Sequence, residues 1–321
     1  MNNTSLCMWP EKVQRCDTVL LLQRIFSAVS LIGCIFIIAL IWLFKTYKYF
    51  VQRLIFFLSV AAGFQSLVFL ISNLHNSDKV CQFQAVMLQY FGWSTLLWVV
   101  CMTVNIILVV RGFSNTSKFE KWYHVLSWIL PIFWSGLPFI GHQYGSAGVW
   151  CWIKRDATLF RFGTWYVPVY VLILFLAFAY LYVFVKVLKQ SGRWSGTYNA
   201  QTQHDNVMLV KEVKPLAAFP LIYLLMTIPT TIYRIDDAVH PQKLPSYVLL
   251  IISSICNPLV GCLNAIAFAF YGEIHALLTW SKIKSAWKSR FAASTTNVTH
   301  NYDVSENLPE QASYESFHDE N

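Results

Sequence analysis

The sequence offers cations for binding rather than groups for catalysis. Four of these cations fall in two short segments: Lys154, Arg155, Arg161 and Arg234. A guanidinium carries a planar fork of donors that matches a phosphate, and several cations at one partly desolvated opening attract an anion. Three carboxylates occupy the same segments: Asp156, Asp236 and Asp237. The sequence therefore also allows the alternative that these charges form solvated local pairs.

No residue pattern predicts a reaction. The chain has no nucleophile motif and no phosphate-binding loop, and His124 stands alone in its apolar stretch, where a packed histidine is a better interpretation than a metal ligand. The middle of each apolar stretch lacks the Asp, Glu, Lys and Arg that ion-coupled pumps and transporters need at the membrane midplane. We therefore expect no enzyme activity, no cofactor and no bound metal.

Composition places the chain in a membrane. Only 12% of its 321 residues are charged and 56% are hydrophobic, whereas soluble domains carry about 25% charged residues. The formal net charge of +8 does not indicate nucleic acid as a partner, because such a chain has no soluble basic surface. The lipid bilayer is the expected surrounding.

Seven stretches are apolar and close to the length of about 20 residues that crosses a bilayer as a helix. They run Val19–Phe44, Leu54–Ser72, Phe83–Val110, Trp122–Ile140, Trp165–Val185, Leu216–Tyr233 and Tyr247–Phe270. Their continuous apolar character, without a two-residue alternation, favours helices over a barrel. We predict an all-α membrane protein, a seven-transmembrane-helix bundle.

The distribution of Lys and Arg predicts which side of the membrane is cytoplasmic. With seven spans, fifteen of the 24 basic residues fall on one side and nine on the other, and the cytoplasmic side carries the excess. We expect a multi-pass protein of the plasma membrane with its N terminus outside. The predicted parts are an extracellular N terminus (1–18), the seven-helix domain (19–271), a cytoplasmic amphipathic eighth helix (272–291) and a disordered tail (292–321).

Cysteines and glycosylation sequons agree with this orientation. Cys81 and Cys151 both fall in outer loops, where oxidation is possible, and a bond between them would pin the second outer loop to the top of the third helix. Cys7 and Cys16 form a second, weaker candidate pair. Two overlapping sequons also lie on the outer side, at Asn2 and Asn3.

Local motifs narrow the class of protein. Five segments carry them: Phe119-Glu120-Lys121-Trp122-Tyr123, Ser127-Trp128-Ile129-Leu130-Pro131, Trp150-Cys151-Trp152-Ile153, Arg161-Phe162-Gly163 and Leu97-Trp98. With seven helices and a disulfide from the third helix to the second outer loop, these motifs resemble the cyclic-AMP-receptor-like (class E) G-protein-coupled receptor family. The third span ends in Arg111-Gly112, not in the Asp-Arg-Tyr triplet of rhodopsin-like receptors.

The resemblance implies a receptor that transmits the signal of an extracellular small-molecule ligand to a heterotrimeric G protein. A cyclic nucleotide becomes the first candidate for the anion, and Arg161, in the matched motif, the first candidate among the cations. Arrestin is a candidate partner of a phosphorylated tail. Candidate G-protein contacts are the cations Arg111, Lys186, Lys189, Lys211 and Lys214. The alternatives are a seven-helix transporter or channel and a membrane scaffold without a ligand.

Glycosidase digestion tests the orientation. We expect digestion to shift the wild-type band on a gel and to leave a variant with Asn2 and Asn3 both replaced by Gln unchanged, because only an outer N terminus meets the glycosylation machinery. Glycosylation at Asn115 or Asn297 would instead place the opposite side of the protein outside.

Overall fold

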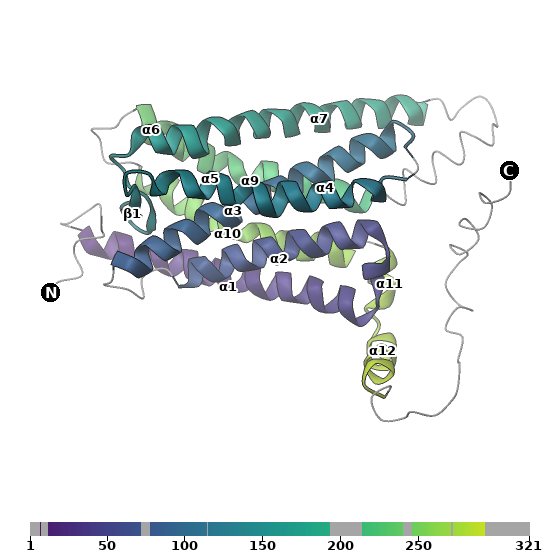
Figure 1. Ribbon diagram of the computed structural model, residues 1–321. Helices are drawn as coiled ribbons and strands as arrows, with labels where there is room; N and C mark the ends of the chain where they lie inside the picture. Colours follow the sequence, from purple (N-terminus) through teal and green to yellow (C-terminus); the bar gives the residue numbers. More distant parts are fainter. Residues whose placement is uncertain are drawn as a thin grey trace. The chain divides into compact units, whose positions relative to one another are not determined.

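The computed structural model describes residue 7 and residues 12–71, 78–113, 115–192, 214–239, 246–270 and 272–292. Contacts divide the chain into two compact units, Met1–Thr279 and Trp280–Asn321. Among these described residues, six helices of the first unit are long and apolar enough to cross a membrane, and they lie side by side (Figure 1). They are α1 (Val13–Leu43), α2 (Phe50–Leu70), α3 (Asp78–Val110), α7 (Val167–Gly192), α9 (Lys214–Val239) and α10 (Tyr247–Phe270).

Several helices extend beyond the apolar stretches that predicted them at one end. α1 begins at Val13 rather than Val19, and α9 continues to Val239 rather than ending at Tyr233. Hydropathy marks the part of a helix that lies in hydrocarbon, whereas the hydrogen-bond ladder propagates through polar residues once a helix has formed. The extension of α9 matters for function, because it makes Arg234 and Asp237 helical residues.

The fourth predicted span, Trp122–Ile140, is a continuous helix whose hydrogen-bond pattern changes along its length. It consists of α4 (Glu120–His124), η5 (Val125–Ile129), α5 (Leu130–Gly136) and η6 (Leu137–Phe139), which follow one another without a break. η5 is a π-helical turn and η6 a 3₁₀ turn. Pro131 cannot donate to the carbonyl four residues before it, so the α-helical ladder cannot continue unchanged past this point. The prediction of an all-α membrane protein is confirmed, with this span segmented.

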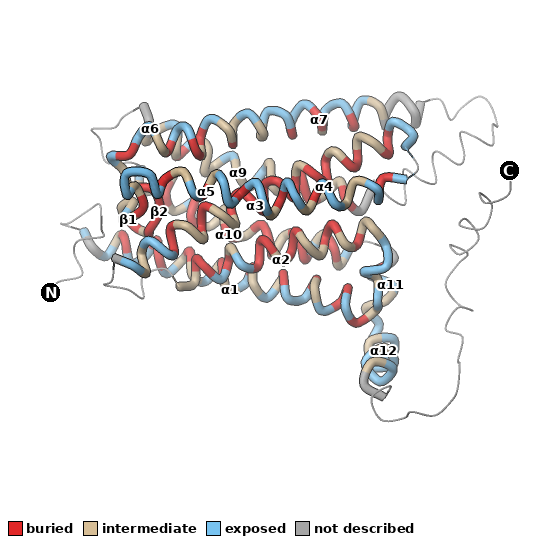
Figure 2. Tube along the Cα trace, in the orientation of Figure 1, coloured by how far each residue is buried: buried red, intermediate tan, exposed pale blue. Residues whose placement is uncertain are grey.

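The surface of α7 shows how the bundle meets lipid. Val171, Leu174, Phe178 and Leu181 follow helical spacing and are between 57% and 69% exposed. The opposite face of the same helix is buried, and Figure 2 shows the two faces as pale blue and red stretches of the tube. A helix with a continuous exposed apolar stripe suits a hydrocarbon surrounding and not water.

α3 forms the centre of the first unit. It contacts α2, α5, α7 and α9 as well as a short hairpin, and 78% of its most apolar stretch is buried. The hairpin pairs β1 (Tyr144–Ser146) with β2 (Cys151–Ile153) in antiparallel register, with Gly145 opposite Trp152. Gly148 in its turn has φ +112°, a conformation that favours glycine. After the hairpin, α6 (Thr158–Arg161) and the π-helical turn η7 (Phe162–Tyr166) lead into α7.

An ion pair ties the bundle together at the end away from the hairpin. Arg53 Nε lies 2.6 Å from Glu120 Oε1 and Arg53 Nη2 lies 2.7 Å from Glu120 Oε2. Arg53 Nη1 also donates to the Lys48 carbonyl at 2.8 Å, in the connection that contains η3 (Thr46–Lys48). The Phe119–Tyr123 motif, which η4 (Ser117–Phe119) introduces, therefore joins α4 to the start of α2.

The predicted eighth helix, Glu273–Phe291, forms as two helices. α11 (Gly272–Leu277) belongs to the first unit, and its Ile274 is buried in the main core. α12 (Trp280–Ala292) belongs to the second unit. Trp280 and Trp287 of α12 are 76% and 56% exposed and lie seven residues apart, as an amphipathic stripe requires.

Substitution of Gly261 tests the close packing of α1 against α10. A methyl group at this position would collide with Ser30 Oγ and Cys34 Sγ, and Ser30 cannot turn away without losing its 3.1 Å bond from Ser66 Oγ. We expect Gly261→Ala to destabilise the protein by about 1–3 kcal/mol, measured as a lower thermal midpoint in detergent. Gly163→Ala is the matched control, because open space surrounds Gly163; equal midpoints for the two variants would contradict the close packing.

Candidate ligand site

A cavity of about 110 Å³ opens beneath the hairpin and reaches the middle of α10. Its walls come from α1, α2, α3, α7 with η7, α9 and α10, and from Trp150 and Trp152 of the hairpin. Gly92 on α3 lets the ring of Trp165 pack closely against α3 in the cavity wall, since a methyl group there would lie 2.6 Å from Cη2 of Trp165. The site is therefore a pocket lined by six helices, and its volume is below the roughly 300–1,000 Å³ of typical small-molecule sites.

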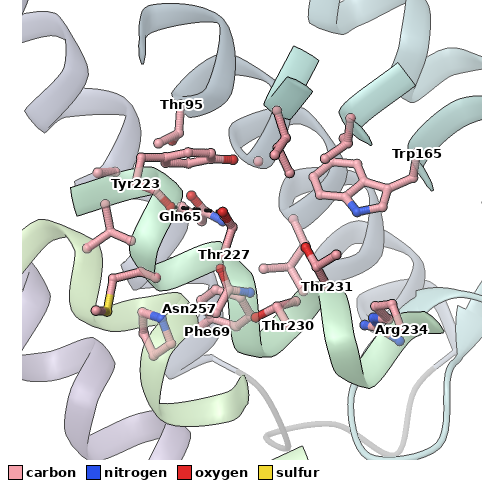
Figure 3. Close-up of a pocket in the computed structure, with 18 of the residues that line it drawn as sticks. Gln65, Phe69, Thr95, Trp165, Tyr223, Thr227, Thr230, Thr231, Arg234 and Asn257 are labelled. Atoms are coloured by element: carbon pink, nitrogen blue, oxygen red, sulfur yellow. Dashed lines mark hydrogen bonds between the residues drawn. The ribbon is translucent and has the colours of Figure 1, made fainter. Parts of the chain in front are cut away.

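One face of α9 supplies a row of polar lining residues. Thr227, Thr230, Thr231 and Arg234 all line the cavity, and their spacing of i, i+3, i+4 and i+7 places them on one side of a helix. Figure 3 shows this row with Trp165 and Arg234 at one end of the cavity and Gln65 and Tyr223 at the other. Asn257 of α10 adds an amide. The cavity thus has one cationic end and an uncharged hydrogen-bonding floor.

Arg234 is held by aromatic rings. Its guanidinium lies 5.1 Å from the ring centre of Trp152, 5.6 Å from that of Trp150 and 5.0 Å from that of Tyr233. Ring faces attract a cation without neutralising it. In the described part of the chain, every ion pair involves other cations, so the charge of Arg234 is available to an anion in the cavity.

Arg155 and Arg161 share one carboxylate. Arg155 Nη2 lies 2.7 Å from Asp237 Oδ1, and Arg161 Nη2 lies 3.3 Å from Asp237 Oδ2. Arg161 is only 6% exposed and also donates to the hydroxyl of Tyr166 at 2.7 Å. Two of the three candidate cations that follow Cys151, Arg155 and Arg161, therefore have a partner from α9.

The remaining candidate cations lie elsewhere. The aliphatic part of the Lys154 side chain packs against Gly145 of β1, and Lys154 does not line the cavity. Arg111 lies over the ring of Tyr182, 5.6 Å from its centre, and Lys186 follows on the same helix as Tyr182, α7. The other candidates fall outside the described residues, wholly or in their side chains: Lys189, Lys211, Lys214, Asn2 and Asn3.

A disulfide and a chain of hydrogen bonds fix the hairpin over the cavity. The structure contains the Cys81–Cys151 bond and also the Cys7–Cys16 bond. Next to Cys151, Trp152 Nε1 donates to Gln89 Oε1 at 2.8 Å, and Gln89 Nε2 donates to the Thr164 carbonyl at 3.2 Å. Covalent and polar links therefore bind the hairpin to α3.

The local sequence explains why the Thr164 carbonyl accepts side-chain donors. Pro168 lies four residues later and has no N–H to offer it. Trp93 Nε1 donates to the same carbonyl at 3.1 Å. Two α3 side chains, Gln89 and Trp93, therefore replace the backbone N–H that Pro168 cannot supply. The sequence around Pro168 thereby orients Trp165 and Tyr166, which follow Thr164 into the cavity wall.

A second anchor holds the first strand of the hairpin. Tyr144 donates its hydroxyl to the Ser135 carbonyl at 2.8 Å. Burial raises the pKa of Tyr144, so the hydroxyl keeps its proton at physiological pH and remains a donor. The hairpin is thus attached to α5 as well as to α3.

Sequence reasoning missed the α9 face and the role of Gln89. The threonine row could have been found, because Thr227, Thr230 and Thr231 precede Arg234 at helical spacing within one apolar stretch. The position of Gln89 carries no such signal, since its partners are 63 and 75 residues away in the chain. Among the described residues, no group of three metal-ligating side chains comes together.

Comparison with known proteins identifies the family. The profile described as "Slime mold cyclic AMP receptor" matches residues 9–271. The chain belongs to this family. The resemblance that the motifs predicted is therefore confirmed, and the protein is a multi-pass member of a receptor family.

Curated relatives of this receptor family come from an amoeba and a plant. The chain is 29% identical over 260 residues to "Cyclic AMP receptor-like protein A" of Dictyostelium discoideum, covering 80% of this chain and 65% of that protein. It is 30% identical over 155 residues to "Cyclic AMP receptor 1" of the same organism, covering 47% of this chain and 39% of that protein. It is 25% identical over 252 residues to "G-protein coupled receptor 1" of Arabidopsis thaliana, covering 77% of this chain and 76% of that protein. The chain thus spans less than two thirds of the first two relatives.

Replacement of Gln89 tests the attachment of the hairpin. Gln89→Leu removes two buried hydrogen bonds. The Trp152 indole loses its acceptor, and the Thr164 carbonyl loses one of its donors. We expect a loss of about 1–3 kcal/mol in the free energy of unfolding and faster amide exchange in residues 150–153, measured by mass spectrometry. The control Gln143→Leu removes only an exposed bond to the Gly141 carbonyl; the same loss in both variants would contradict the assigned role.

Proposed function

We propose that this family member is a G-protein-coupled receptor that binds a small extracellular anion in the cavity beneath the hairpin. The observation that carries the proposal is Arg234, a cation at the end of a six-helix cavity that is held by rings and not by an ion pair. Arg234 is half-buried, and a cation in such a place gains from a counter-charge, which a ligand anion would supply.

The lining also supports a shape for the ligand. The cationic end suits one compact anionic group, and Thr227, Thr230 and Asn257 suit the edge of an uncharged polar group. Indole and phenol rings along the walls suit a flat ring system. A cyclic nucleotide combines these features, because a phosphodiester anion is attached to a planar base with donors and acceptors. The names of two relatives, which refer to cyclic AMP, favour the same candidate.

The proposed orientation places the hairpin end outside the plasma membrane and the α11 end in the cytoplasm. Arg111, Lys186, Lys189, Lys211 and Lys214 are then the candidate contacts for a heterotrimeric G protein. Asn2 and Asn3 are the glycosylation sites, and the segment after residue 292 is the phosphorylatable tail that arrestin would bind. Pro220 and Pro229 lie within α9, where a missing backbone bond at each favours bending when the receptor is activated.

Nucleotide exchange on purified G protein tests this function. We expect cyclic AMP to accelerate exchange through the wild-type receptor, and Arg234→Gln to weaken the agonist by about 1.5–3 kcal/mol, the scale of a hydrogen bond to a charged group. Lys154→Gln is the control, because it removes the same charge outside the cavity. An agonist whose potency is equal in wild type and Arg234→Gln would contradict the anion site, and exchange that no anion accelerates would contradict the receptor function.

A further inference from the structure

Asp237 sits between two cations at the end of α9. Its two carboxylate oxygens lie 2.7 Å from Arg155 Nη2 and 3.3 Å from Arg161 Nη2, and its side chain is only 8% exposed. Arg155 precedes α6 and Arg161 ends it. We call these three residues the Asp237 latch, because they join the last turns of α9 to the segment that follows the hairpin.

The latch lies next to the cation of the cavity. Arg234 precedes Asp237 by three residues on the same helix. Arg161 and Arg234 both approach the ring of Trp152, at 5.5 Å and 5.1 Å from its centre. The latch and the proposed anion site are therefore separated by one aromatic side chain.

Two cations of this region share one carboxylate. Arg155, Arg161 and Arg234 carry three positive charges, and among the described residues Asp237 forms ion pairs with Arg155 and Arg161. Arg161 Nε is also buried without a hydrogen-bond partner. Of the other nearby carboxylates, Asp156 is exposed and Asp236 precedes Asp237 on α9. A cluster of this kind gains from a second anion.

We propose that Asp237 is a built-in counter-anion that holds α9 against the hairpin segment until a ligand anion competes for the same cations. This inference rests on the proposed function, since it takes the ligand to be an anion at Arg234. The new negative charge repels Asp237 and attracts Arg161, so the latch weakens. The segment of α9 that follows Pro229 is then free to move. Bending at Pro229 transmits this movement along the helix.

Coupling of this kind is reciprocal. If an anion weakens the latch, then loss of the latch strengthens binding of the anion by the same factor. A purely structural ion pair predicts the reverse, because Arg161 and Trp152 would lose their positions and the cavity would bind an anion less well. The two readings differ in sign, so one variant separates them.

Hydrogen exchange of the purified full-length receptor in detergent, without ligand, tests the latch first. Asp237→Asn removes the charge at constant size, and we expect about ten-fold faster amide exchange in residues 151–161 and 231–239. Asp156→Asn, which removes an exposed charge on the same segment, is the matched control and should exchange as wild type. Should Asp237→Asn fail to fold, Arg155→Gln removes one arm of the latch and should speed exchange in the same peptides. Unchanged exchange in the folded variants would overturn the latch.

Binding of cyclic AMP and of inorganic phosphate tests the competition. We expect Asp237→Asn to bind cyclic AMP about five-fold more tightly than wild type or better, and cyclic AMP to speed exchange in the same wild-type peptides. Equal or weaker binding by Asp237→Asn would overturn the competition. If wild type binds neither probe, the proposed ligand class is wrong, and the latch is decided by the exchange of the ligand-free variants alone.

Discussion

This structure depends on one constraint: each backbone carbonyl in its low-dielectric interior needs a hydrogen-bond donor. In hydrocarbon each backbone group needs a partner from the protein, and prolines withdraw a donor at fixed places. Two π-helical turns, η5 and η7, each end two residues before such a proline, Pro131 and Pro168. Both turns then receive donors from α3, through Tyr90 on the Trp128 carbonyl and through Gln89 and Trp93 on the Thr164 carbonyl.

That arrangement makes α3 the scaffold of the site. Its side chains fix the turns at which the fourth span and α7 change pitch, and its first turn holds the hairpin through Cys81. Gln89 serves both purposes, because its oxygen accepts from Trp152 of the hairpin while its amide nitrogen donates to η7. The hairpin and the aromatic wall of the cavity are consequently positioned by the same residues. This supports a site that is largely formed before a ligand enters.

Electrostatics divide the site into a fixed part and a reactive part. Arg155 and Arg161 are engaged by Asp237 across two segments of the chain, whereas Arg234 is surrounded by rings. Two arginines share this one carboxylate, and Arg161 Nε is buried without a hydrogen-bond partner, so the desolvation of the cluster is only partly offset. In the proposed function, Arg234 is the group that attracts the ligand anion. Arg161, the first ligand-binding candidate from the sequence, therefore does not line the cavity, whereas Arg234 does.

Several features of this protein were determined by the sequence alone. Apolar runs of membrane-spanning length predicted the helices, and the positions of Cys81 and Cys151 predicted the bond between them, because hydropathy and local patterning are properties of short segments. The five motif segments, together with the expected seven helices and outer disulfide, predicted the family. The polar face of α9 was also predictable, because helical spacing puts four residues on one side: Thr227, Thr230, Thr231 and Arg234.

Tertiary structure alone decided which charges meet. Arg161 and Asp237 are 76 residues apart in the chain, and Trp152 and Gln89 are 63 apart. Helical periodicity says which residues share a face, but it does not say which neighbour that face packs against or how far a helix extends past its apolar run. The last turns of α9 formed beyond the predicted end of the span, and there Asp237 could reach the two arginines. Long-range pairing depends on the packing of whole helices, so no local pattern specifies it.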